Sequence, residues 1–118
     1  MNLDERIRTA LTGICDVVVP QVYTGDAQEY IVFNYSEYPL AFADDEPQEV
    51  GYSIHVHLFL PLKVNPNTKK DSIKTALFSA GFTYPSIQDV TDEDGQHYVE
   101  ECDIVLYIGG GAVWQKSK

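Results

Sequence analysis

The sequence has few of the residues that several common sites and segments require. Only two of its 118 residues are cysteines, Cys15 and Cys102, and neither belongs to a CxxC pair or a zinc spacing. No apolar run approaches the ~20 residues of a membrane span, and the charged start MNLDERIRTAL is unlike a signal peptide. We therefore expect two reduced, buried cysteines and a protein that stays in the cytoplasm of the cell that makes it.

Basic residues are also scarce. Eight lysines and arginines stand against eighteen aspartates and glutamates, which gives a formal net charge of −10. An acidic surface repels the phosphates of DNA and RNA, so we expect no nucleic-acid partner and no membrane partner. The acids concentrate at 43–49 and 89–95, while the second half of the chain carries Lys69, Lys70, Lys74, Lys116 and Lys118. Such separation can steer one copy onto another, although acidic loops that only keep a protein soluble are more common.

Sequence signatures of catalysis are missing as well. No serine lies in a G-x-S-x-G elbow, and the glycines of IGGGAV are followed by neither a helix pattern nor a P-loop lysine. Neighbouring carboxylates such as Glu100 and Glu101 alternate along a strand, which favours solvated charge. We expect no catalytic residues, no cofactor and no enzymatic activity.

What the sequence does contain is a clear pattern of helices and strands. Apolar residues at helical spacing predict a short first helix, which Gly13 and the segment after it end, and a second helix that Asn67 or Thr68 caps and Gly81 ends. The apolar stripe of the first helix is Leu3, Ile7, Ala10, Leu11 and Ile14. Alternating patterns predict strands at 29–38, 49–61 and 97–108, an edge segment around Pro20 and a hairpin through DEDG.

This order predicts an α+β fold, a single antiparallel-rich sheet with two helices packed on one face. We expect one domain over residues 1–108 and a flexible C-terminal tail at 109–118, in which Trp114 is the anchoring candidate. Residues 39–50, PLAFADDEPQEV, are acidic and interrupted by two prolines. They are therefore predicted to form a long loop or an open hairpin tip.

The motif His-Val-His at 55–57 raises the question of a metal site. Alternate side chains of a strand leave the same face, so His55 and His57 could chelate together if His97, with Glu101 and Asp103 on its own strand face, supplied a further ligand. No metal-binding spacing supports this, and we expect no bound metal. The apolar residues that alternate in the same strand are predicted to face the core, and they are Tyr52, Ile54, Val56, Leu58 and Leu60. The two histidines are therefore predicted to lie on the opposite face.

The order of the segments is itself informative. An amphipathic helix is followed by VVVPQVYTGD, YIVFNYSE, a long loop, YSIHVHLFLP, KKDSIKTALFSAGF and DVTDEDGQHYVEECDIVLYI. This order, over roughly residues 3–108, resembles that of the small tail-completion proteins of long-tailed phages and prophages. The resemblance implies a non-enzymatic tail terminator or head-to-tail joining protein, which forms a ring such as a hexamer and contacts tail-tube or head-connector proteins. It also implies a location in the host cytoplasm during assembly and then in the tail of the virion.

The resemblance implies roles for regions of this chain and not for single catalytic residues. The loop at 39–50 and the open face of the sheet would correspond to surfaces used between subunits, and aromatic side chains on that face favour a contact role. The candidate interface residues are Leu40, Phe42, Asp44, Asp45, Glu46, His55, His57 and Phe59.

Two other classes of protein remain open. An acidic binding protein of the inhibitor or immunity type would explain the net charge of −10, although acids segregated into two segments do not form a phosphate-like track. A small metal-binding protein would rest on the His-Val-His motif alone.

Overall fold

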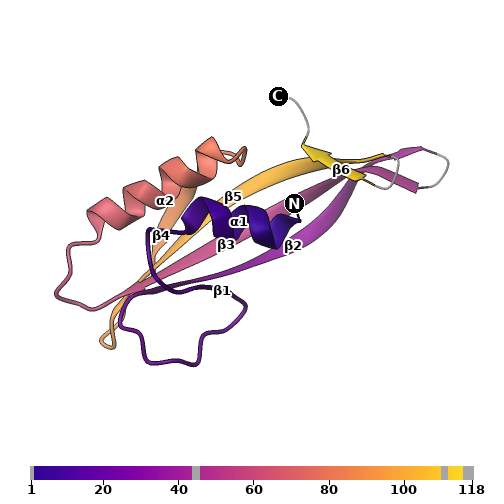
Figure 1. Cartoon of the computed structure of the whole chain (residues 1–118). Helices are drawn as coiled ribbons and strands as arrows, with labels where there is room; N and C mark the ends of the chain where they lie inside the picture. Colours follow the sequence, from indigo (N-terminus) through magenta and orange to yellow (C-terminus); the bar gives the residue numbers. More distant parts are fainter. Residues whose placement is uncertain (1, 44–45, 110–111, 116–118) are drawn as a thin grey trace.

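The computed structural model describes residues 2–43, 46–109 and 112–115, with side chains described for 2–40 and 49–106 (Figure 1). In this part of the chain six strands form one sheet in the order β1-β2-β3-β5-β4, with β6 beside β5. The elements are α1 (Leu3–Leu11), β1 (Val18–Pro20), β2 (Tyr30–Ala43), β3 (Glu46–Leu60), α2 (Asn67–Ser79), β4 (Ser86–Asp89), β5 (Gln96–Gly109) and β6 (Ala112–Gln115).

The two helices begin at different kinds of cap. At α1 the Asn2 side chain accepts a hydrogen bond from the Glu5 N–H at 2.8 Å, which satisfies one of the free donors of the first turn. At α2 the predicted cap by Asn67 or Thr68 is wrong, because the helix already includes both residues and Asn65 accepts from the Asn67 N–H at 3.0 Å. Within the described residues, neither helix is long and apolar enough to cross a membrane.

Alternation along the strands decides which side chains enter the core. In β3, Ile54, Val56 and Leu58 are fully buried and pack with α1 and α2 on one face of the sheet. The register continues this face into the neighbouring strands, where Ile54 lies opposite Tyr35 of β2 and Cys102 of β5. The predicted α+β fold, with both helices on one face of a single sheet, is confirmed.

Both cysteines are free and buried, as predicted. Burial raises the pKa of Cys102 to about 12 and also raises the pKa of Cys15. Because the thiolate is the reactive form of cysteine, neither side chain is a candidate nucleophile at neutral pH.

Residues 39–50 belong mainly to strands and not to a long loop. β2 continues to Ala43, β3 begins at Glu46, and these two residues pair with each other. The long loop is therefore a wrong prediction, whereas the pairing of Ala43 with Glu46 agrees with the alternative of a hairpin; residues 44–45 lie outside the described residues. Pro39 is compatible with β2 because its main chain points away from β3, toward the uncovered edge, so its missing N–H costs no bond of the β2–β3 ladder; the register shifts directly after it.

The predicted flexible tail contains a strand. β6 pairs antiparallel with β5, from Gly109 opposite Ala112 to Leu106 opposite Gln115. Its central residues, Val113 and Trp114, favour strand conformation. Residues 112–115 thus form a strand within the segment that the sequence predicts to be a flexible tail.

The molecule is elongated. It measures 54 × 27 × 23 Å and has a radius of gyration of 15.6 Å, whereas a compact domain of this length would have about 13.5 Å. Figure 1 shows the reason, because α1 and α2 cover one part of the sheet while β2, β3 and β5, with β6, extend past them. We call this extension, residues 38–43, 46–50, 106–109 and 112–115, the arm.

Candidate functional site

The face of the sheet opposite the helices, called the open face here, carries the predicted histidines. At one end of this face, cross-strand pairing places Tyr30 of β2, Phe59 of β3 and His97 of β5 in one row. The ring centroids are 4.6 Å apart for Tyr30 and Phe59 and 4.2 Å apart for Phe59 and His97. Tyr23, which follows β1, packs on Tyr30 at 4.7 Å. The rings pack on one another, so much of their apolar surface is already covered within the chain.

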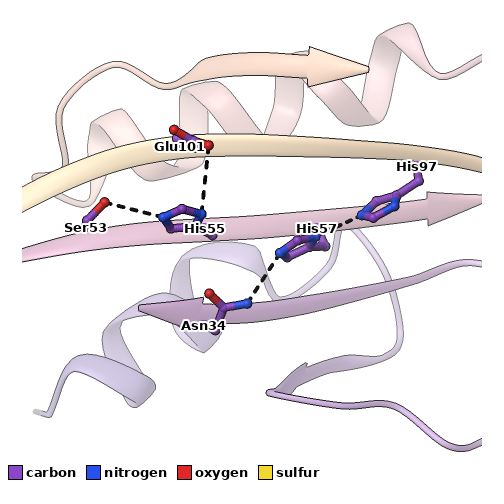
Figure 2. A network of polar contacts seen from close by, with 6 residues as sticks. All are labelled: Asn34, Ser53, His55, His57, His97 and Glu101. Carbon is purple, nitrogen blue, oxygen red and sulfur yellow. Dashed lines mark hydrogen bonds and ion pairs between the residues drawn. The ribbon is translucent and has the colours of Figure 1, made fainter. Parts of the chain in front are cut away.

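His57 lies between Asn34 and His97 on the same face, as Figure 2 shows. Its Nδ1 is 2.8 Å from Nε2 of His97, and its Nε2 is 3.4 Å from the Asn34 amide nitrogen. With this amide orientation Asn34 donates to Nε2 of His57, so Nδ1 of His57 carries the proton and donates to His97. One neutral tautomer of each ring thus satisfies the whole set of contacts.

His55 has different partners from His57. Its Nε2 is 3.5 Å from the Ser53 hydroxyl, and its Nδ1 is 3.9 Å from a carboxylate oxygen of Glu101 (Figure 2). Because the His55 and Glu101 side chains are both accessible to water, this ion pair contributes little to stability. The His-Val-His motif therefore places two rings on one face, as predicted, without making them a functional pair.

The geometry does not bring the histidines together as metal ligands. The facing nitrogens of His57 and His97 share a hydrogen bond, and Glu101 and Asp103 lie farther along β5 on the open face. In the part of the chain that the structure describes, no three His, Cys, Asp or Glu side chains are grouped so that they could hold a metal ion. The pairing of β3 with β5, which a site including His97 would need, is present.

The pKa values of His57 and His97 are both lowered from the ordinary value of 6.5. For His57 the main cause is burial, followed by the nearby rings of His97 and His55. For His97 the cause is burial, which Asp92 partly offsets. Because the folded state favours the neutral rings, their contribution to stability is present above pH 6.5 and is lost as the pH falls through the lowered pKa values.

We expect the His57 ring to titrate below pH 6.5 in ¹H–¹³C NMR spectra, and to titrate closer to 6.5 in the His97→Gln variant. The substitution removes a neighbouring imidazole but leaves most of the burial in place. The His55→Gln variant is the matched control and should move the His57 titration less, because His55 has the weaker influence. An identical His57 titration in the wild type and in His97→Gln would contradict the coupling of the two rings.

A shallow hollow of about 340 Å³ lies beside His57 on the open face. Its wall is mainly aromatic, and Val22 at its edge is 68% exposed. Of the polar groups that line it, Asn34, His57 and His97 already use nitrogens in contacts with one another, and the Tyr23 hydroxyl accepts from the Ala27 N–H. Ligand sites need polar groups that are free to orient the ligand, so the hollow does not make a strong small-molecule site.

The candidate interface residues divide into three groups. On the open face, His55, His57 and Phe59 are partly buried by their neighbours. On the arm Leu40 is 47% exposed, whereas Phe42 and Glu46 lie in β2 and β3 with side chains outside the described set. Asp44 and Asp45 lie outside the described residues altogether.

Two exposed aromatic residues of β2 were not among the predicted interface residues. Tyr35 and Tyr38 are each 36% exposed, beyond the part of β2 that pairs with β1. The Tyr38 ring lies over Gly51, where an added Cβ would come within 2.2 Å of it. The signal in the sequence is the run of aromatic residues in YIVFNYSEY, which continues past the length of an average strand. Tyr35 lies on the helix-covered face, opposite Ile54, and its hydroxyl donates to Asp4 of α1. Tyr38 and Leu40 therefore form the exposed apolar strip of β2, where the arm begins.

Glu100 is the second feature that sequence reasoning missed. Its side chain is fully buried on the core face of β5, and neither carboxylate oxygen has a hydrogen-bond partner within the described residues. Burial raises its pKa to about 8, against the lowering effect of Lys74 and Lys70 on α2. The prediction of solvated charge is therefore wrong for Glu100, although it holds for the exposed Glu101. This raised pKa favours the protonated form of Glu100 at neutral pH.

Comparisons of this chain with known protein families and with curated proteins find no match. Its own geometry offers a satisfied histidine network, an extended arm and an exposed apolar strip on β2. Of these, the strip and the arm are the surfaces with unused contact area, and such surfaces are typical of proteins that bind other proteins.

Proposed function

We propose that this chain is a structural assembly protein of a phage or prophage tail, acting in tail completion or in head-to-tail joining without catalysis. The proposal starts from the order of segments in the sequence, which resembles that of tail-completion proteins. The α+β fold with two helices on one face of a single sheet agrees with what the resemblance implies.

The observation that carries the proposal is the arm with its exposed apolar strip. An extension that the two helices leave uncovered adds surface without adding much core, so it contributes little to the stability of the isolated chain. A contact with a partner would bury this surface. Tyr38 and Leu40 keep apolar area in water along this part of β2. Protein–protein contacts use this kind of surface, with aromatic residues near the centre.

The histidines of the open face have a smaller part in this function than the sequence predicts. His57 and Phe59 are partly buried and have partners within the chain, so they offer little new contact area. The subunit contacts are therefore assigned to the arm and the part of β2 that adjoins it, with the open face as a neighbouring surface. The partners are other copies of this chain, in a ring such as a hexamer, and the proteins of the tail tube or head connector. Assembly takes place in the host cytoplasm, and the ring then stays in the virion.

Electron microscopy of particles labelled with gold-conjugated antibodies against this chain tests the proposed location. The phage or prophage that encodes the chain is induced, and its particles are purified before labelling. We expect label at one end of the tail, next to the head. Particles without label, or with label along the whole tail, would overturn the proposed position at the head-proximal end.

A further inference from the structure

β2 has a long edge that no strand covers in the described chain. β1 pairs with β2 only from Ile31 to Phe33, whereas β2 continues to Ala43. The Ile31 N–H donates to the Val17 carbonyl, and the Phe33 carbonyl accepts from the Gln21 N–H. These contacts show which residues of β2 turn their main-chain groups toward the β1 side.

The alternation of strand geometry identifies the free groups. Because Ile31 and Phe33 point toward β1, Tyr35 and Glu37 point their N–H and C=O groups to the same side, beyond the end of β1. The described residues provide no main-chain partner for them there. Pro39 has the same orientation but no N–H, so the edge that can accept a strand ends before it. We call Tyr35 to Glu37 the free edge of β2.

The side chains around the free edge suit a protein partner. Tyr38, next to the free edge, is 36% exposed and Leu40 is 47% exposed, whereas Tyr35 turns to the helix-covered face and donates to Asp4. Proteins normally protect such an apolar edge strand, because it is a template for pairing with another strand. An edge that keeps both its main-chain donors and its apolar side chains is therefore a candidate for strand addition.

A second uncovered edge lies on the other side of the sheet. In the arm the strand order is β2-β3-β5-β6, and the described chain has no strand beyond β6. Each neighbouring pair in this order is antiparallel. With four strands, the two outer ones, β2 and β6, run in opposite directions.

We propose that the free edge of β2 binds β6 of a second copy of this chain as an added antiparallel strand. When copies related by rotation stand side by side, β6 of one copy runs antiparallel to β2 of the next, so the alternation of the sheet continues across the contact. Two different patches meet, which is the kind of contact that closes into a ring. This contact would join neighbouring copies in the ring of the assembly function proposed above, and its biological meaning rests on that function.

Charge favours this arrangement over pairing of two β2 strands. A contact between two copies of β2 would bring two Glu37 side chains together and would leave both β6 edges uncovered. In the sequence, Lys116 and Lys118 follow β6, whereas the free edge of β2 carries Glu37. Pairing of β2 with β6 thus joins segments of opposite charge, and the matching signs favour the correct partner.

Disulfide trapping tests the contact directly in the full-length protein. Glu37→Cys is made in one sample, and Val113→Cys or Trp114→Cys in another. The variants are oxidised alone and mixed, with native Cys15 and Cys102 buried in both. We expect cross-linked pairs only in the mixtures, with at least one of the two β6 variants. Cross-linking of Glu37→Cys with itself, or none in any mixture, would overturn the proposal.

A proline substitution separates the effect of the main-chain N–H at the free edge from the effect of the Glu37 side chain. Glu37→Pro removes only an outward N–H and leaves the β2–β3 ladder intact, so it should remain folded and lose concentration-dependent association in native mass spectra. Glu37→Thr is the matched control, because it removes the same carboxylate but keeps the N–H, and it should associate at least as well as the wild type. Equal association of the two variants would contradict pairing through the main chain.

These results are independent of the proposed role in tails. If trapping fails but particles still require the chain, the contact between β2 and β6 is wrong and the assembly function stands. If trapping succeeds and particles do not require the chain, the contact stands and the assembly function is wrong.

Discussion

The Glu100→Gln variant should become more stable than the wild type as the pH rises from 5 to 9. In the wild type, the contribution of the protonated carboxyl group is fully present below about 4.5 and is lost as the pH passes about 8. Glutamine has a similar shape and does not ionise, so the variant avoids a buried charge. The stability difference should grow by on the order of 4 kcal/mol over this range, measured by chemical denaturation at each pH.

Glu101→Gln is the matched control for this measurement. Glu101 is next to Glu100 on β5 but points to the open face and is exposed. Its substitution removes the same charge from water, so its stability curve should run parallel to that of the wild type. Parallel curves for Glu100→Gln and the wild type would show that Glu100 ionises at its ordinary pKa, and the buried-acid interpretation would be wrong.

Shortening the arm should abolish the joining of tails to heads while the protein still folds. The change replaces residues 41–47 by an Asn-Gly turn, which suits a two-residue hairpin connection. The buried core residues of β2 and β3, such as Phe33 and Ile54, lie outside the replaced segment. We therefore expect little change in unfolding free energy, and an absence of joined particles when the variant is the only copy in the host.

The control for the arm variant changes the other acidic segment. Replacing Glu93 and Asp94 by serine removes two charges from the turn between β4 and β5, at the opposite end of β5 from the arm. That variant should support normal joining. Joined particles in normal numbers with the shortened arm would show that the arm is not the joining surface.

The sequence predicts the core of the fold because alternation carries a strong physical signal. A shift of one residue would turn Ile54, Val56 and Leu58 to water, so their pattern fixes both the register and the face that the helices cover. The same alternation correctly places His55 and His57 on the other face.

The features that the sequence did not predict depend on contacts between distant segments. Glu100 has the parity of Cys102 and therefore the core face, but only packing under α2 shows that its carboxyl group is completely excluded from water. Pro39 indicates a loop by its local preference, yet pairing with β3 and a neighbouring bulge keep it within a strand. His57 and His97 are 40 residues apart, and the 2.8 Å contact between them follows from the pairing of β3 with β5.

Electron microscopy of lysates from a host in which the gene for this chain is disrupted tests the central claim most directly. The account predicts separate heads and tails, or tails of abnormal length, and recovery of joined particles when the intact gene is supplied in trans. Normal joined particles in the absence of the chain would contradict a role in tail completion or head-to-tail joining.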